Sequence, residues 1–487
     1  MRTLFWLFLV AAAVMAPSIL MGPGVSHSST YNFVWTSQFG DALRQGTLYP
    51  RWLPGSFEGM GAPVFFFYPP LAFWLSGGLD ALGLSTEQAI NGAAFVVLLL
   101  SGLAMHHWLK ERSQWPLAGA IAYMVAPYHL LDFGVRGALA EFASFIWLPL
   151  IALGIARLPE RRGVLLLGCS FAGMILTHLP MATLTGLFLI APLVVWRIRS
   201  DRTLLLPAIG AGLLGVALSA FYLLPAAMLQ AHISVKALWA PYYNPVNWHF
   251  FWHPDDTLGN LQMLGLGLIA LSLAVPARNI WTVLTIVTAV AAIGIVPFLW
   301  LIPPLDKVQF PWRLLGVTEF VAITALFTAR VRLKPLYLAA GAALLIVPYA
   351  LLAQYSLIAM QKQPDRAALA TLPDAVEYVP PTYNYWPIID RRRMLDLRQY
   401  RDLPRGTAIT VDRPGPVTMG RWDFPAFAVE HEGKRIPSAG PILHFEASAP
   451  GTYRIVRVWL WQEVVGGILS VLAVLAAAML ARTRRAR

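Results

Sequence analysis

The sequence has 487 residues, of which 57% are hydrophobic and only 13% are charged, and its mean hydropathy is +0.59. This composition excludes a soluble globular protein and a disordered chain, and apolar stretches of about 18 or more residues, the length that crosses a bilayer, recur along it. The net charge of +12 does not indicate nucleic-acid binding, because Lys and Arg cluster in short loops between the apolar stretches. We therefore expect a polytopic α-helical membrane protein.

Twelve transmembrane helices are predicted, at about residues 3–21, 88–109, 115–128, 141–156, 163–179, 181–196, 203–224, 258–276, 280–301, 313–330, 335–353 and 459–481. The first is expected to be retained rather than cleaved as a signal peptide, because Pro17 follows the only suitable small-residue site. The apolar segment from Tyr68 to Leu84 is nearly long enough to span. If it crossed, the later basic loops would face outward, so we expect it to lie along the membrane surface. Both termini are then predicted to be cytoplasmic.

Three parts of the chain are predicted. Residues 1–353 form the transmembrane domain, and residues 22–87 within it form a large first periplasmic loop with surface helices. Residues 354–458 form a small periplasmic β-rich domain, because alternating apolar and polar residues recur at 407–411, 426–430, 442–447 and 452–458 between turn-forming residues. Residues 459–487 form the final transmembrane helix and a basic cytoplasmic tail.

Six segments, in order along about residues 1–330, resemble one family. They are Leu48-Tyr-Pro-Arg-Trp-Leu-Pro, Tyr68-Pro-Pro-Leu, Ala126-Pro-Tyr-His-Leu-Leu-Asp-Phe-Gly-Val-Arg-Gly-Ala-Leu-Ala-Glu141, Thr177-His-Leu-Pro, Ser219-Ala-Phe-Tyr-Leu-Leu-Pro and Gln309-Phe-Pro-Trp-Arg-Leu-Leu-Gly. Together they are similar to bacterial membrane proteins labelled 6-pyruvoyl-tetrahydropterin synthase-related, and through these to the YfhO-like and wider GT-C glycosyltransferases. The resemblance implies a GT-C-like fold in the bacterial inner membrane, with the active face in the periplasm.

GT-C enzymes take a sugar from a polyprenyl-phosphate carrier. The resemblance therefore implies a lipid-linked sugar donor as co-substrate and a glycan or lipid acceptor, and it identifies no other cofactor. Such a transfer needs a carboxylate for the acceptor and cations for the leaving phosphate. The family pattern has an aspartate where this chain has Ser28. Serine does not replace that base without activation, so this departure puts the usual base in doubt.

Four residues are candidates for the catalytic acid–base role. Asp132 and Arg136 are four residues apart, so a helical turn would place them on one face, with Glu141 at the head of the next span. Either they form an ion pair that holds the loop, or Asp132 or Glu141 faces the acceptor while Arg136 binds phosphate. His27 is either a base near neutral pH or a polar anchor. Asp41 is either a base or part of a solvated helix face.

Further candidates would bind the phosphate of the carrier. Arg313 follows Phe-Pro-Trp at the outer end of a predicted span, where a guanidinium either binds phosphate or snorkels to the interface. Lys236 and Lys307 are weaker candidates of the same kind. His178, at the outer turn between two predicted spans, either binds the carrier head group or caps a helix. Glu319, inside a predicted span, is either functional or a structural hydrogen-bonding group.

No metal site is predicted. His249 and His253 are four residues apart, but the sequence between them lacks the glutamate of a zinc-protease motif. The leading hypothesis is a membrane glycosyltransferase that moves a sugar from a polyprenyl-phosphate donor to a lipid-linked or envelope glycan acceptor on the periplasmic face. One rival, favoured by Ser28, is a non-catalytic lipid or glycan transporter or accessory protein. Another is a scaffold whose β-domain recruits partners.

Overall fold

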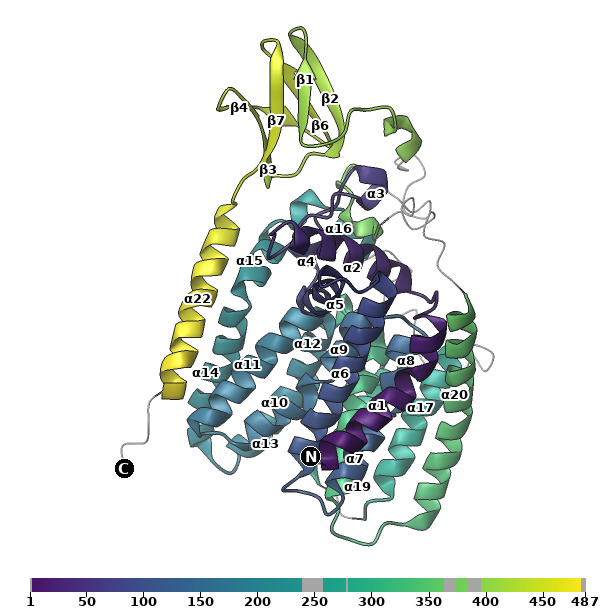
Figure 1. The fold of residues 1–487 in the computed structure, drawn as a ribbon. Helices are drawn as coiled ribbons and strands as arrows, with labels where there is room; N and C mark the ends of the chain where they lie inside the picture. Colours follow the sequence, from purple (N-terminus) through teal and green to yellow (C-terminus); the bar gives the residue numbers. More distant parts are fainter. Residues whose placement is uncertain (1, 239–256, 277–278, 363–373, 384–395, 483–487) are drawn as a thin grey trace.

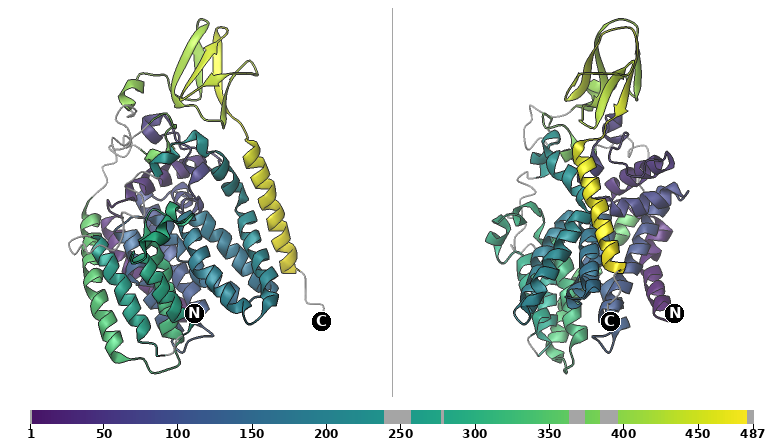
Figure 2. Two further views of the ribbon diagram at one scale, coloured as in Figure 1. Left: turned by 180° about the vertical axis from the view of Figure 1, so that it is seen from behind. Right: turned by 90° about the vertical axis from the view of Figure 1, so that its left-hand side faces the viewer.

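The computed structural model describes residues 2–238, 257–276, 279–362, 374–383 and 396–482. Figure 1 shows a bundle of helices with a layer of short helices across one end and a small β-domain beyond that layer. The first helix begins, and the last helix ends, at the opposite end of the bundle. Figure 2 shows the same order of bundle, layer and β-domain from two further sides. We call residues 22–85 the first loop, and the end of the bundle that they cover the covered end.

Helices make up the bundle and most of the first loop. The first ten are α1 (Arg2–Met21), α2 (Ser29–Arg44), α3 (Ser56–Gly59), α4 (Val64–Phe67), α5 (Leu71–Ala81), α6 (Thr86–Leu109), α7 (Pro116–Met124), α8 (Pro127–Gly134), α9 (Leu139–Ser144) and α10 (Trp147–Ala156). Those that follow are α11 (Arg161–Thr177), α12 (Leu179–Thr185), α13 (Ala191–Ile198), α14 (Leu205–Leu218), α15 (Ala220–Met228), α16 (Val235–Leu238), α17 (Thr257–Leu273), α18 (Ile280–Ala292), α19 (Leu314–Thr328), α20 (Pro335–Gln361) and α22 (Trp461–Arg482).

Six helical stretches of the described chain are long and apolar enough to cross a membrane, namely 2–21, 86–109, 139–156, 179–198, 335–361 and 461–482. A seventh is added if α14 and α15, which are bent by 70°, form one broken span. The other predicted spans are helical too, but α7, α11, α17, α18 and α19 have only 9 to 17 residues each. A multi-pass helical membrane protein is therefore supported, whereas the predicted number of twelve crossings is not confirmed.

An aromatic core around Trp35 of α2 holds the first loop together. This side chain is only 4% exposed. Its ring lies 4.7 Å from that of Tyr68, 5.4 Å from that of Phe73 and 5.8 Å from that of Phe65, all in edge-on contacts. The apolar segment that begins at Tyr68 contains α5, whose 11 residues reach about 16 Å and so do not span a bilayer. Instead, α5 packs against α2 within the first loop.

The β-domain consists of two antiparallel sheets with an apolar core between them. Its strands are β1 (Ala408–Val411), β2 (Gly415–Trp422), β3 (Phe427–His431), β4 (Lys434–Ile436), β5 (Ser438–Ala439), β6 (Ile442–Ala447) and β7 (Gly451–Arg457). One sheet has the order β1-β7-β3-β4 and the other β2-β6-β5. The four predicted strands correspond to β1, β3, β6 and β7. At the predicted turn between β3 and β4, Glu432 and Gly433 both have positive φ, as a two-residue hairpin turn requires.

The β-domain and the last helix are attached to the first loop. Phe424, just after β2, packs with its ring 5.0 Å from that of Phe66. Glu463, in the first turn of α22, is 4% exposed and forms ion pairs with Arg51 of the first loop (3.0 Å) and Arg457 of β7 (2.6 Å). Because a buried carboxylate needs charged partners, these pairs join α22, the β-domain and the first loop to one another.

The first loop turns sharply at Gly61, where the backbone φ is +82° and a Cβ atom would lie 2.3 Å from Cζ2 of Trp52. Gly46 has a similar φ of +86°, but a Cβ atom there would meet nothing within 4 Å. Both replacements by alanine should incur the left-handed backbone cost of about 1–3 kcal/mol, and Gly61→Ala should lose more because Trp52 must also move. We expect a lower apparent melting temperature in detergent for Gly61→Ala than for Gly46→Ala. Equal losses would contradict the close approach of Trp52.

Candidate functional site

Helix α8 and the turn after it carry the central residues of the candidate site. Pro127 occupies the first turn of α8, where a missing N–H is harmless. The two carboxylate oxygens of Glu319, on α19, accept the backbone N–H groups of Tyr128 (2.7 Å) and His129 (3.0 Å) at this helix start. Glu319 therefore holds the start of α8 through hydrogen bonds.

The charged residues that follow in the chain meet below the first loop. Nη1 of Arg136 lies 2.5 Å from Oδ1 of Asp132 and 2.8 Å from Oε1 of Glu141. On the other side of the Glu141 carboxylate, Nε of Arg313 lies 3.0 Å from Oε2 of Glu141. The hydroxyl of Tyr128 donates to Oε1 of Glu141 at 2.7 Å. We call Asp132, Arg136, Glu141 and Arg313 the charge cluster; it holds two positive and two negative groups.

Burial makes this arrangement costly unless each charge is paired. The side chains of Asp132 and Glu141 have no exposed surface, and those of Arg136 and Arg313 are 15% and 10% exposed. Ion pairs of such low exposure are screened little by solvent, and removal of one partner leaves an unpaired buried charge. The alternative of an ion pair that holds the loop is therefore present in the structure, whatever further role the cluster has.

Both arginines keep N–H groups for a ligand. Arg136 makes all of its described contacts, to Asp132, Glu141 and the hydroxyl of Tyr128, through Nη1. Arg313 uses Nε for Glu141 and Nη1 for the backbone oxygen of Val308 at 2.7 Å. Within the described residues, Nη2 of each arginine has no hydrogen-bond partner, and neither atom is fully enclosed. Planar guanidinium groups with free edges suit the oxygen atoms of a phosphate.

His178 completes the cluster on the side of α11 and α12. Its Nε2 lies 4.0 Å from Oε2 of Glu141, and its side chain is 7% exposed. Its Nδ1 is buried without a hydrogen-bond partner among the described residues, as is Oδ2 of Asp132. Since buried polar atoms are normally satisfied, these two atoms are available to a ligand or to water.

The N-terminal end of α2 covers the cluster. The backbone N–H of Ser28 donates to the backbone oxygen of Arg136 at 2.8 Å, and Nδ2 of Asn32 donates to that of Gly137 at 2.6 Å. Gly137 has a φ of +62°, and a Cβ there would lie 2.6 Å from Oγ of Ser26. Position 28, where the family pattern has its acid, therefore lies beside the cluster.

His27 lies next to this contact, with Nδ1 3.4 Å from Oγ of Ser28. Burial lowers the pKa of His27, and the positive charges of Arg136 and Arg313 lower it further. The imidazole is therefore mainly neutral at pH 7, the form in which a histidine accepts a proton. The structure thus places His27 near the cluster.

The remaining predicted candidates lie elsewhere. Asp41 is 56% exposed and pairs with Arg44 at 2.6 Å on the outer side of α2. Lys307 is 52% exposed and pairs with Asp306 at 2.9 Å, and Lys236 is exposed on α16. None of these three belongs to the charge cluster. His249 and His253 fall outside the described residues, and the described ones contain no group of three or more His, Cys, Asp or Glu that would hold a metal ion.

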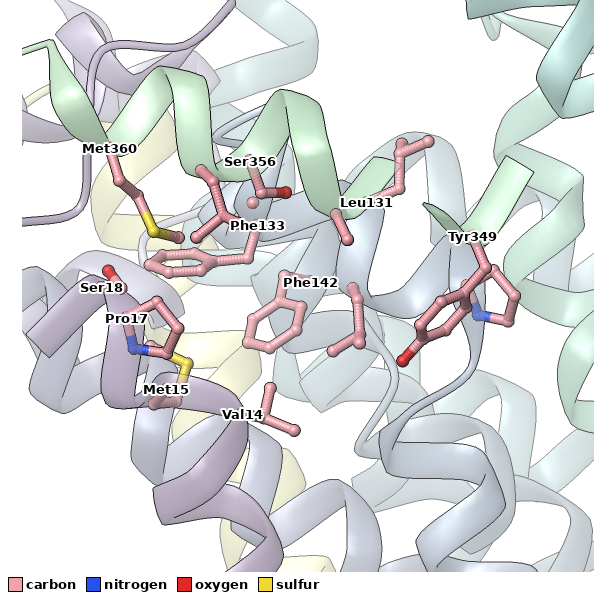
Figure 3. A pocket seen from close by; sticks show the side chains of 15 residues that line it. Val14, Met15, Pro17, Ser18, Leu131, Phe133, Phe142, Tyr349, Ser356 and Met360 are labelled. Atoms are coloured by element: carbon pink, nitrogen blue, oxygen red, sulfur yellow. The ribbon is translucent and has the colours of Figure 1, made fainter. Parts of the chain in front are cut away.

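An apolar pocket of about 250 Å³ lies between α1, α8, α9 and α20. Figure 3 shows Phe133 and Phe142 at its centre, Val14 and Pro17 on one side and Ser356 on the other. Leu131 and Phe133 of its lining flank Asp132 in the chain, and Phe142 directly follows Glu141. The cluster residues themselves do not line the pocket, but α8 and α9 contribute to both.

Two site residues escaped sequence reasoning as individual candidates. Tyr128 stands inside the long quoted motif, but a tyrosine that follows Ala-Pro at a predicted span boundary has the pattern of an interfacial anchor. Tyr68 begins an apolar segment that is expected at the membrane surface, where a tyrosine is typically an interfacial anchor, whereas its side chain packs against Trp35 in the first loop. Only their tertiary contacts distinguish them from the other aromatic residues.

No protein-family model matches the sequence, and no curated protein sequence matches it. Among solved structures, the chain is similar to the arabinofuranosyltransferase AftD from Mycobacteria, with 13% identity and a TM-score of 0.44 over 92% of this chain and 40% of that chain. Two structures of an AftD mutant are similar with 14% identity and a TM-score of 0.45 over 92% of this chain and 41% of that chain. The chain thus spans about two fifths of the length of these proteins. TM-scores this low assign neither fold nor activity.

Loss of the central carboxylate should destabilise the covered end. Glu141→Gln leaves two buried guanidinium groups with one carboxylate, which by analogy with other broken buried pairs costs about 3–5 kcal/mol. Asp41→Asn, which removes one partner of an exposed pair, should have little effect. Apparent melting temperatures of the purified variants in detergent would test this. A Glu141→Gln variant as stable as Asp41→Asn would contradict the role of Glu141 as the shared partner.

Proposed function

We propose that the protein is a membrane glycosyltransferase of GT-C type. It moves a sugar from a polyprenyl-phosphate donor to a lipid-linked or envelope glycan acceptor at the periplasmic face. The observation that carries the proposal is the charge cluster: Arg136 and Arg313 are oriented by Glu141, and Nη2 of each has no hydrogen-bond partner among the described residues. The resemblance of six ordered sequence segments to the GT-C enzymes supports the same assignment.

The chemistry of sugar transfer explains why such a cluster would be useful. When the bond between sugar and phosphate breaks, the phosphodiester of the donor becomes a monoester, so negative charge develops on the phosphate. Preoriented guanidinium groups in a water-poor site stabilise that charge without reorganising during the reaction. Arg136 and Arg313 are held in this way by Glu141, and His178 lies beside them.

The apolar pocket supports a lipid-linked donor. A polyprenyl chain needs apolar surface, while its phosphate needs cations at the membrane boundary. The pocket lined by Val14, Leu131, Phe133, Phe142 and Met360 offers the first next to the second, because α8 contributes both pocket residues and Asp132. In the proposal, the first isoprene units occupy this pocket while Arg136 and Arg313 bind the phosphate.

The rival function is binding without transfer, as in a lipid or glycan transporter or accessory protein. The observation that favours it is the internal pairing of the cluster. Both oxygens of Glu141 are engaged by cations, and Oδ1 of Asp132 is held by Arg136. Neither carboxylate is then a strong base, and Ser28 supplies none. Transfer and binding therefore have to be measured separately.

The purified protein should transfer labelled sugar from at least one of a set of polyprenyl-phosphate sugars to envelope glycan acceptors. Arg313→Ala should lower kcat by about 100-fold or more, because charge stabilisation in the transition state is lost. Arg313→Lys keeps the charge but loses the planar guanidinium, so its kcat should lie between that of Arg313→Ala and that of the unmodified protein. Asp132→Asn should lower transfer as well, and Asp41→Asn should keep the rate of the unmodified protein. No transfer with any donor, together with retained binding of polyprenyl phosphate, would overturn the enzyme assignment in favour of the rival.

The apolar pocket gives a separate prediction about donor length. Val14→Trp would fill the pocket and should raise the KM for a long-chain donor about tenfold. The KM for a donor of one or two isoprene units should stay nearly unchanged. Leu9→Trp, at a 40% exposed position of the same helix, is the matched control. The measurement is the ratio of KM values for the two donors. If Val14→Trp and Leu9→Trp show the same ratio, the lipid chain does not occupy this pocket.

A further inference from the structure

A second cavity, of about 1130 Å³, lies in the layer of short helices between the bundle and the β-domain (Figure 1). It shares no lining residue with the apolar pocket. Helix α3, the turn between α5 and α6, and Arg401, which precedes β1, form parts of its wall. Helix α2 forms another part through five residues whose spacing puts them on one side of the helix, namely Phe33, Val34, Ser37, Gln38 and Arg44. We call this cavity the α2 cleft.

The arginines that line the α2 cleft are paired with carboxylates of the same lining. Nε and Nη2 of Arg401 donate to the two carboxylate oxygens of Glu58 at 2.8 and 3.0 Å. Nη1 of Arg44 lies 3.0 Å from Oδ1 of Asp80, and the hydroxyl of Thr86 donates to Oδ2 of Asp80 at 2.8 Å. An anionic ligand would therefore meet at least as much negative as positive charge. The cleft does not suit a phosphate or a polyanion.

The same side chains leave polar groups accessible to an uncharged ligand. The side chains of Arg44 and Arg401 are 44% and 54% exposed, and that of Glu58 is 17% exposed. Carboxylate oxygens have further lone pairs and guanidinium groups have further N–H donors beyond one ion pair. Ser37 adds a half-buried hydroxyl and Leu84 adds apolar surface. A sugar matches this lining, because its hydroxyl groups both donate and accept hydrogen bonds and its ring carries apolar C–H faces.

The backbone is strained where Glu58 enters the α2 cleft. Phe57 and Glu58 have φ values of +52° and +56°, a region that residues other than glycine rarely adopt. The side chain of Phe57 is completely buried, and its ring lies 6.3 Å from that of Trp422 on β2. This burial holds the backbone in the conformation in which Glu58 meets Arg401, 343 positions later in the chain. Strain of this kind is frequent at ligand-binding sites, where it fixes a side chain in advance.

Helix α2 connects the α2 cleft to the charge cluster. Phe33 lines the cleft, and the side chain of its neighbour Asn32 donates to the backbone oxygen of Gly137, which follows Arg136. The contact with the cluster and the start of the cleft thus lie within one turn of the same helix. From Phe33 to Arg44, α2 extends about 16 Å, which is longer than a single sugar ring. The cleft therefore has room for several sugar units.

We propose that the α2 cleft binds an uncharged oligosaccharide, namely the part of the acceptor glycan that lies beyond the reacting sugar. The assignment to the acceptor rests on the proposed function, whereas the binding itself does not require transfer. Glu58 and Asp80 accept hydrogen bonds from sugar hydroxyl groups, and Arg44 and Arg401 donate to sugar oxygens. The cleft raises the affinity for long acceptors and takes no part in the bond changes at the reacting sugar.

The first test is calorimetric titration of the purified protein in detergent with neutral hexasaccharides of glucose, galactose, mannose and arabinose. At least one should bind, whereas hexagalacturonic acid, a polyanion, should not. Ser37→Trp fills the cleft and should weaken this binding at least tenfold. Glu58→Gln keeps the shape of the side chain but removes its charge, and should weaken binding by about tenfold. Gln45→Trp, at an exposed position at the end of α2 outside the lining, is the matched control and should bind like the unmodified protein.

Transfer assays separate this inference from the function on which it partly rests. Ser37→Trp should raise the KM for a hexasaccharide acceptor about tenfold more than the KM for a monosaccharide acceptor. If hexasaccharides bind but no donor supports transfer, the cleft binds oligosaccharide, and both its assignment to the acceptor and the proposed function fail. If transfer occurs but no neutral hexasaccharide binds, or Ser37→Trp and Gln45→Trp bind equally well, the inference is wrong and the glycosyltransferase assignment remains. Binding of hexagalacturonic acid alone would also overturn the inference.

Discussion

The buried carboxylate of Glu141 is the group on which the covered end of the bundle depends. It accepts from Tyr128 and Arg136 through one oxygen and from Arg313 through the other. These contacts join the turn after α8 and the start of α9 to the start of α19, because Arg313 and Glu141 are 172 positions apart in the chain. A carboxylate without exposed surface requires such partners, because an unpaired charge at this depth costs several kcal/mol.

The same pairing accounts for both the stability and the proposed chemistry of the site. A cluster of two carboxylates and two guanidinium groups has no net charge, so it can be buried without a bound ligand. Yet Nη2 of each guanidinium has no hydrogen-bond partner among the described residues and stays available. In the proposed reaction this leaves the cations preoriented for a phosphate, while it makes Asp132 and Glu141 weak bases.

The covered end is assembled from three parts of the chain. The first loop supplies Trp35 and Tyr68, the region from α8 to α9 supplies three members of the charge cluster, and the segment before the β-domain supplies Asp374 and Tyr378. Trp35 lies in the aromatic core of the first loop, and its Nε1 donates a hydrogen bond to Asp374 of the segment before the β-domain. The β-domain and α22 are tied to the same layer through the ion pairs of Glu463. Contacts in one part are therefore expected to affect the others.

The membrane class, most helix positions and four of the seven strands could be predicted from the sequence, because they follow from local composition and periodicity. The four-residue spacing of Asp132 and Arg136 and the nearby Glu141 also indicated a contact that helix geometry makes almost unavoidable. The assignment of Arg313 and His178 to the same region followed from their place at predicted span ends. The number of crossings did not follow, since several predicted spans form helices of 17 residues or fewer.

By itself, then, the sequence determined a multi-pass helical protein with a β-domain and a short catalogue of charged residues at one end. Only the tertiary structure decided which of them meet. Asp41 and Lys307 pair with neighbours in the chain and stay exposed, whereas Glu141 and Arg313 pair across 172 positions and are buried. The periodicity of apolar residues shows which face of a helix is buried, but it does not show which distant segment packs against that face. The two cationic partners of Glu141 therefore became visible only where distant segments pack together.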